Sequence, residues 1–176
     1  IPNNAGGDPA DFRVRNILSG SFEITLAEPP SEDGPHVAMQ VAYMAVEEGS
    51  WTLPDNRKIV AGKVSTSQLI FKGGGGTQII TLPSGLTNPI VVAAIQGVAN
   101  ETGNVPAQPS NPWLAVAIRN VTSNSFELAL DGCECTNMTP AQSEIIGWMA
   151  IDGNVQGSFS DDDGVMVDYE TIDTGA

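Results

Sequence analysis

The chain alternates short apolar runs with clusters of Gly, Pro, Asn and Ser. The runs are rich in β-branched residues, and no stretch of twelve residues shows the 3.6-residue period of an amphipathic helix. They cover residues 22–26, 37–46, 78–82, 89–95, 114–118, 125–130 and 145–151. Short strands at roughly regular spacing, separated by turn residues, are typical of antiparallel sandwiches. The pattern therefore predicts an all-β protein with an antiparallel β-sandwich.

Two blocks of sequence recur about one hundred residues further along the chain. RNILSGSFEITL, which begins at residue 15, matches RNVTSNSFELAL, which begins at residue 119. VAYMAVE, from residue 41, matches IGWMAID, from residue 146. Such self-similarity at a fixed period indicates a repeated structural unit. We expect each copy to form a strand, a turn, a strand that buries Phe22 or Phe126, and a closing strand with Tyr43 or Trp148.

The two copies differ in completeness. A segment with two or three predicted strands, residues 67–113, precedes the second copy, whereas only residues 1–12 precede the first. We divide the chain into a partial first repeat, residues 1–64, and a complete second repeat with a C-terminal acidic hairpin, residues 65–176. The segment after Gly153 resembles residues 49–62. An unfinished sandwich exposes strand edges, so either a neighbouring chain fills the gap or the chain is part of a longer tandem array.

Three motifs of the second repeat resemble those of the H-type lectin domain, the family of snail agglutinin and the discoidin C-terminal domain. They are PIVV at 89–92, RNVTSNSF at 119–126 and GWMA at 147–150. The resemblance covers about residues 67–152 in full and 10–47 in part. It implies a six-stranded antiparallel sandwich, commonly oligomeric, that binds galactose or N-acetylgalactosamine without a metal and without catalysis.

Four residues are candidates for carbohydrate binding. The resemblance implies an arginine on the strand before the turn; Arg13 holds that position in the first repeat, and Arg119 lies on the same strand face in the second. It also places a polar partner at Glu134. Trp113, at the start of a strand, offers an indole face on which the apolar side of a sugar stacks.

Two further features concern cysteines and acidic residues. Cys133 and Cys135 are two residues apart, which suits a small loop disulfide, free thiols or a bridge between chains. Asp161 and Asp163 belong to a DDDG loop whose oxygens suit calcium, or which forms a solvated acidic turn.

The charge of the chain excludes several classes of partner. With 21 Asp and Glu against 7 Lys and Arg, the net charge is -14, and no basic patch exists to neutralise nucleic-acid phosphates or anionic membranes. No apolar run approaches the ~20 residues of a membrane helix. One histidine and the lack of a nucleophile elbow argue against an enzyme. The acidic, lysine-poor composition suits an extracellular, secreted protein.

We therefore expect a non-enzymatic extracellular binding or adhesion module whose ligand is a carbohydrate or glycoconjugate. The alternative is a structural subunit of an extracellular filament that polymerises by strand complementation between chains. Self-association is expected in both cases. No cofactor is expected apart from the calcium candidate.

Overall fold

The structure is a computed structural model that describes residues 7–30, 32, 36–70, 76–100, 113–132, 140–153, 155–160 and 163–171. Within these ranges it contains strands and no helix, which confirms the all-β prediction. The strands are β1 (Asp11–Arg15), β2 (Glu23–Ala27), β3 (Gly49–Thr52), β4 (Lys58–Thr66), β5 (Gln78–Thr81), β6 (Ile90–Ile95), β7 (Leu114–Arg119), β8 (Ser125–Gly132), β9 (Glu144–Ile151), β10 (Val155–Ser160) and β11 (Met166–Thr171).

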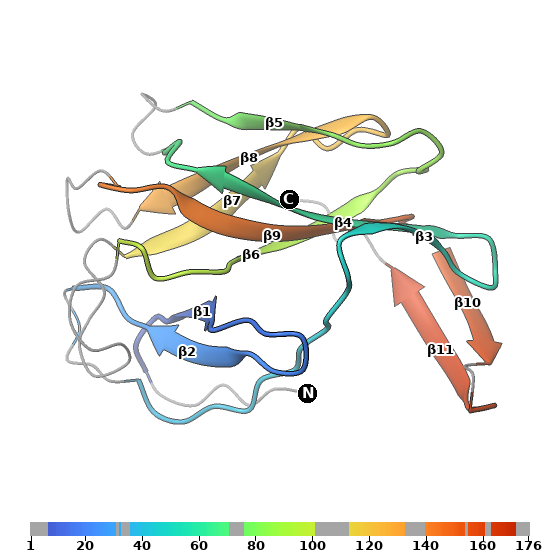
Figure 1. Cartoon of the computed structure of the whole chain (residues 1–176), viewed down its shortest axis with the longest axis horizontal. Coiled ribbons are helices and arrows are strands. Elements are labelled where there is room, and N and C mark those ends of the chain that lie inside the picture. Colours follow the sequence, from blue (N-terminus) through green and yellow to red (C-terminus); the bar gives the residue numbers. More distant parts are fainter. Residues whose placement is uncertain are drawn as a thin grey trace.

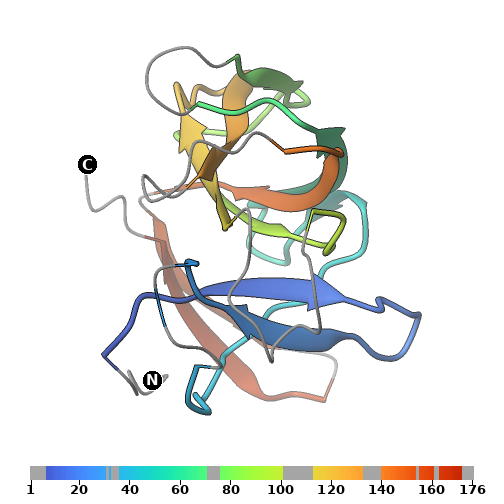
Figure 2. The ribbon, with the colours of Figure 1, turned by 90° about the vertical axis from the view of Figure 1, so that its left-hand side faces the viewer.

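Two antiparallel sheets form the sandwich (Figure 1). One has the order β3-β4-β9-β6 and the other the order β5-β8-β7. The β1–β2 hairpin forms a third layer, on the side of the β3-β4-β9-β6 sheet that faces away from the β5-β8-β7 sheet (Figures 1 and 2). The β10–β11 hairpin is a separate two-stranded sheet beside the sandwich.

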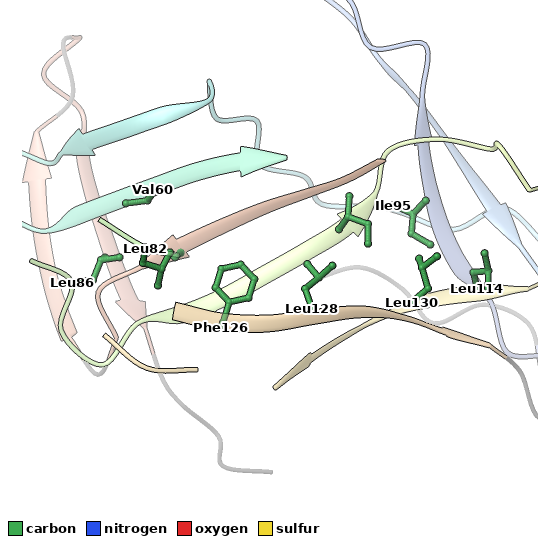
Figure 3. Close-up of a cluster of buried hydrophobic side chains, with 10 residues drawn as sticks. Val60, Leu82, Leu86, Ile95, Leu114, Phe126, Leu128 and Leu130 are labelled. Atoms are coloured by element: carbon green, nitrogen blue, oxygen red, sulfur yellow. The ribbon is translucent and has the colours of Figure 1, made fainter. Parts of the chain in front are cut away.

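The core lies between the two larger sheets (Figure 3). Alternate residues of β8 point inward, and Phe126, Leu128 and Leu130 are all 0% exposed. The Phe126 ring meets the Trp148 ring edge-on, with centroids 5.3 Å apart. Gly62 makes room for this indole, because a Cβ there would lie 2.6 Å from Trp148 Cζ2. The core thus explains why an aromatic residue closes this repeat.

The sequence repeat is also a structural repeat. β1 pairs with β2 in the register in which β7 pairs with β8. Each hairpin has an Arg–Glu ion pair of 2.9 Å across its strands, followed by an asparagine at φ 50° in the left-handed region. The ion pairs are Arg15–Glu23 and Arg119–Glu127, and the asparagines are Asn16 and Asn120. We call residues 11–47 the first unit and residues 49–151 the second unit.

The strand predicted over residues 37–46 does not form. These residues match β9, which is hydrogen-bonded to β4 on one side and to β6 on the other. The described part of the first unit contains no counterpart of β4 or β6 with which this segment could form a ladder. Tyr43 still meets Phe22 edge-on at 5.0 Å, as Trp148 meets Phe126, but it is 70% exposed.

The strands that follow this segment belong to the second unit. β3 and β4 were placed with the first repeat by the sequence boundary at residue 64, yet β4 pairs with β9 over Ile59 to Thr66. The C-terminal hairpin predicted from the tail does form, as β10–β11. It repeats β3–β4 at an offset of 108 residues: Phe159 faces Val167 as Trp51 faces Ile59. Within the described residues, the first unit thus repeats part of the second, and β10–β11 repeats the β3–β4 hairpin.

Candidate functional site

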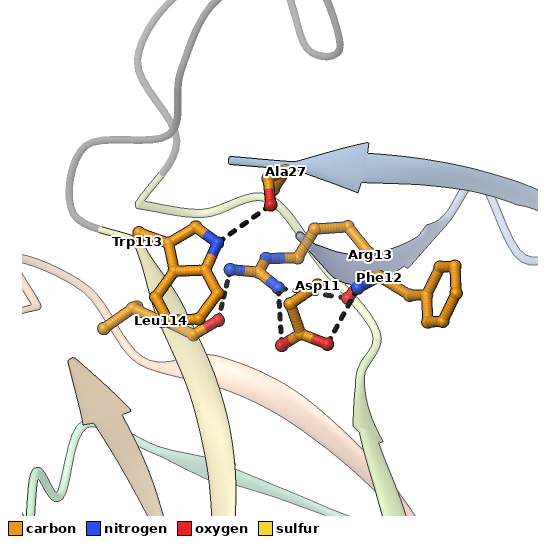
Figure 4. A network of polar contacts seen from close by, with 6 residues as sticks. All are labelled: Asp11, Phe12, Arg13, Ala27, Trp113 and Leu114. Carbon is orange, nitrogen blue, oxygen red and sulfur yellow. Dashed lines mark hydrogen bonds and ion pairs between the residues drawn. The ribbon is translucent and has the colours of Figure 1, made fainter. Parts of the chain in front are cut away.

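Two predicted sugar-binding residues lie together where the first unit meets the second (Figure 4). Arg13 is 1% exposed; its guanidinium donates to the Leu114 carbonyl and, at 3.3 Å, to the Asp11 carboxylate. The indole of Trp113 donates to the Ala27 carbonyl at 2.8 Å. We call these five residues the junction. Both side chains use their polar atoms on the chain itself, so they hold the β1–β2 hairpin against the sandwich.

Arg119, the third predicted residue, belongs to a different group of side chains. Its Nε donates to Glu127 at 2.9 Å, and the same carboxylate accepts hydrogen bonds from Thr77 Oγ1 at 2.7 Å and Asn120 Nδ2 at 2.8 Å. Hydrogen bonds from Thr77, Asn120 and Arg119 lower the pKa of Glu127 from 4.5 to about 2. We call these four residues the polar cluster. It presents an ionised carboxylate, a guanidinium and an amide at the surface.

The junction and the polar cluster lie at opposite ends of β7. Trp113 precedes the first residue of β7 and Arg119 is its last. At about 3.3 Å per strand residue, the two are separated by roughly 20 Å. One small sugar therefore does not contact both, and the predicted set divides into two groups.

The remaining predicted residues are only partly described. Glu134, Cys133, Cys135 and Asp161 lie outside the described residues. Asp163 is exposed, in the turn between β10 and β11. No group of three or more His, Cys, Asp or Glu side chains with metal-binding geometry occurs within the ranges that the structure describes. The disulfide and calcium hypotheses stay predictions.

Sequence reasoning missed two buried carboxylates that fix the loops around β9. Glu144 is 2% exposed and accepts hydrogen bonds from the main-chain and side-chain nitrogens of Asn100, both at 2.8 Å. Asp152 accepts from the main-chain nitrogens of Lys58 at 2.9 Å and Thr87 at 2.7 Å. The signal was their position, since they stand at the first residue of β9 and directly after its last. Both have structural roles.

An apolar groove of about 510 Å³ separates the first unit from the β3-β4-β9-β6 sheet. Its first-unit side includes Phe22, Ile24 and Tyr43, and its floor includes Val92 and Met149. The counterparts of these first-unit residues in the second unit close its core, so the groove marks the side on which the first unit is unfinished.

A search of curated proteins finds a relative of this chain. The chain is 29% identical over 154 residues to Halomucin from Haloquadratum walsbyi (strain DSM 16790 / HBSQ001). The aligned residues are 86% of this chain and 2% of Halomucin, so the chain spans a small part of that relative. No family model matches the chain, and no solved structure matches it. Among the described residues, no helix is long and apolar enough to span a membrane.

Proposed function

We propose that the chain is a non-enzymatic adhesion module of an extracellular protein and that its complete second unit binds carbohydrate at the polar cluster. The observation that carries the proposal is the Glu127 carboxylate with its ring of donors at the exposed end of β7 and β8. Sugars are recognised through hydroxyl groups that both donate and accept hydrogen bonds. An ionised carboxylate accepts such bonds strongly, and a guanidinium and an amide donate them.

Three other observations support this function. The described fold is a sandwich, an architecture that carries binding sites in many proteins. The resemblance to H-type lectins points to galactose-type sugars. The relative is named as a mucin, which supports an extracellular location.

Calorimetric titration of the chain with galactose, N-acetylgalactosamine and a wider glycan panel tests the proposal. Arg119→Ala and Glu127→Gln should each weaken binding at least tenfold, because each removes a charged hydrogen-bonding partner. Arg15→Ala is the matched control: it removes the same kind of exposed ion pair from the first unit and should leave binding unchanged. Binding that survives both polar-cluster variants but is lost in Trp113→Phe would move the site to the junction, and no binding across the panel would refute the function.

A further inference from the structure

At the end of the first unit, residues 41–46 form no strand, and the described residues of this unit hold no counterpart of β4 or β6. Residues 41–46, which we call the open edge, contain no charged residue and no proline. Tyr43 and Met44 within it are 70% and 65% exposed. Natural proteins usually protect such edges with charges, proline or a covering element, because unpaired backbone groups template another strand.

The apolar face beside the open edge is also incompletely covered. Phe22, Ile24 and Leu26 are only partly buried. Their counterparts in the second unit, Phe126, Leu128 and Leu130, are each 0% exposed. The second unit achieves this burial because β4, β9 and β6 close over β8, whereas the groove lies over this part of the first unit.

The β10–β11 hairpin, which we call the tail hairpin, has one apolar and one polar face. Its register puts Phe159 opposite Val167 on the first face, and puts Ser158 opposite Asp168 and Gln156 opposite Glu170 on the second. Within the described residues it is a sheet of two strands, and a lone hairpin is at best marginally stable in water. Its pairing copies β3–β4, and β4 is the strand that pairs with β9.

We propose that the tail hairpin of one copy of this chain pairs through β11 with the open edge of a second copy, antiparallel as β4 is to β9 within the second unit but displaced by one residue. The Phe159–Val167 face turns inward onto Phe22, because burying Asp168 without a partner costs several kcal/mol. In the register of β4, Asp168 would take the place of the core residue Val60, and a shift of one residue brings Val167 to the inward face instead.

This inference goes beyond the proposed function, since it concerns assembly and not ligand binding. The contact joins two different surfaces at opposite ends of the chain. Such heterologous contacts do not close on themselves unless the rotation permits a ring, so they generate filaments. Each copy carries a net charge of -14, so association should strengthen with salt, which screens the repulsion.

Sedimentation velocity of the full chain over a range of concentrations in 0.1 M and 2 M NaCl tests the proposal. The weight-average mass should grow well beyond 18.4 kDa with concentration, and more so at high salt. Ala42→Pro removes a backbone donor from the open edge, and Val167→Asp places a charge on the inward face of the tail hairpin. Each should leave the chain monomeric. Ile79→Glu, at a 64% exposed position on β5, is the control and should assemble like the natural sequence.

Mixing the two blocked variants identifies the mode of pairing. The Ala42→Pro chain keeps an intact tail hairpin and the Val167→Asp chain keeps an intact open edge, so the mixture should form a dimer of about twice the chain mass and stop there. Circular dichroism checks that each variant is folded. If Ala42→Pro does not fold, Met44→Glu replaces it as the variant that blocks the open edge. A natural chain that stays monomeric at high concentration and salt, a mixture that stays monomeric, or a Val167→Asp chain that dimerises through its open edge alone would each overturn the proposal.

Discussion

Replacing the equivalent phenylalanines Phe126 and Phe22 compares how much each side chain stabilises a complete unit and a partial one. Phe126 is fully buried and meets Trp148 edge-on at 5.3 Å. Phe22 holds the matching position and meets Tyr43 edge-on at 5.0 Å, but is only partly buried. The two alanine substitutions therefore remove the same atoms and the same type of ring contact from sites that differ in their cover.

The structure gives different magnitudes for the two losses. Phe126→Ala should lower the free energy of unfolding by about 3–5 kcal/mol, because the lost transfer energy and the cavity add. At Phe22 water can fill the open site, so little cavity energy is lost. About half of the roughly 1.5–3 kcal/mol of a fully buried side chain, with part of the ring contact, leaves about 1–2 kcal/mol for Phe22→Ala.

Urea titrations followed by tryptophan fluorescence measure both losses. The protein is kept dilute and at low salt so that association between copies does not cover Phe22. Midpoints are compared at unchanged slope, which reports stability without a change in the surface exposed on unfolding. Equal losses for the two variants, or a larger loss for Phe22→Ala, would refute the difference in completeness between the units.

Three further predictions follow from charge and packing. Glu127→Gln should flatten the decline of the melting temperature in acid. The pKa of the Glu127 carboxyl is lowered from 4.5 to about 2, so the ionised group stabilises the fold fully above pH 4.5 and this stabilisation is lost as the pH falls towards 2. A decline identical to that of the unsubstituted chain would contradict this. Raising NaCl from 0.1 to 1 M should raise the melting temperature, because the screening length falls from about 10 to about 3 Å in a chain of net charge -14; a flat response would contradict this. Gly62→Ala should lower the free energy of unfolding in urea titrations by about 1–3 kcal/mol, because the added Cβ would press on Trp148. Gly20→Ala is the control, because a Cβ added there meets no atom within 4 Å. Similar losses for the two variants would refute the packing argument.

Local patterns predicted the hairpins well. The β1–β2 and β7–β8 hairpins each combine an alternating run, a turn asparagine and a phenylalanine, so their pairing is encoded within fewer than 20 consecutive residues, 11–27 and 114–132. The sequence match between residues 15–26 and 119–130 was enough to predict two similar hairpins, and the structure confirms the all-β class. The tail hairpin was also indicated by its similarity to residues 49–62.

The strand predicted over residues 37–46 was wrong because strand formation depends on distant partners. The apolar pattern around Tyr43 matches that of β9. In β9 the same pattern becomes a strand because β4 and β6 supply its backbone hydrogen bonds. A single-strand pattern carries no information about whether those partners are present.

The candidate sugar residues were only partly predictable for a related reason. Arg13 looks like a ligand residue from its distance to Phe22, but the packing between the units buries it against the Leu114 carbonyl. That packing is a long-range property of the fold. Arg119 was a candidate, but its pairing with Glu127 was not predicted, although the Arg and the Glu recur in both copies of the sequence match.

Hydrogen exchange at matched positions of the two units tests most directly the claim that the first unit is an incomplete copy of the second. In dilute protein at low salt, amides of residues 146–151 should exchange slowly, because β9 is bonded on both sides, whereas amides of residues 41–46 should exchange nearly as fast as in an unfolded chain. Under conditions of assembly, protection should appear at residues 41–46 and in β11 together. Equal protection of the two segments in dilute protein would contradict the account.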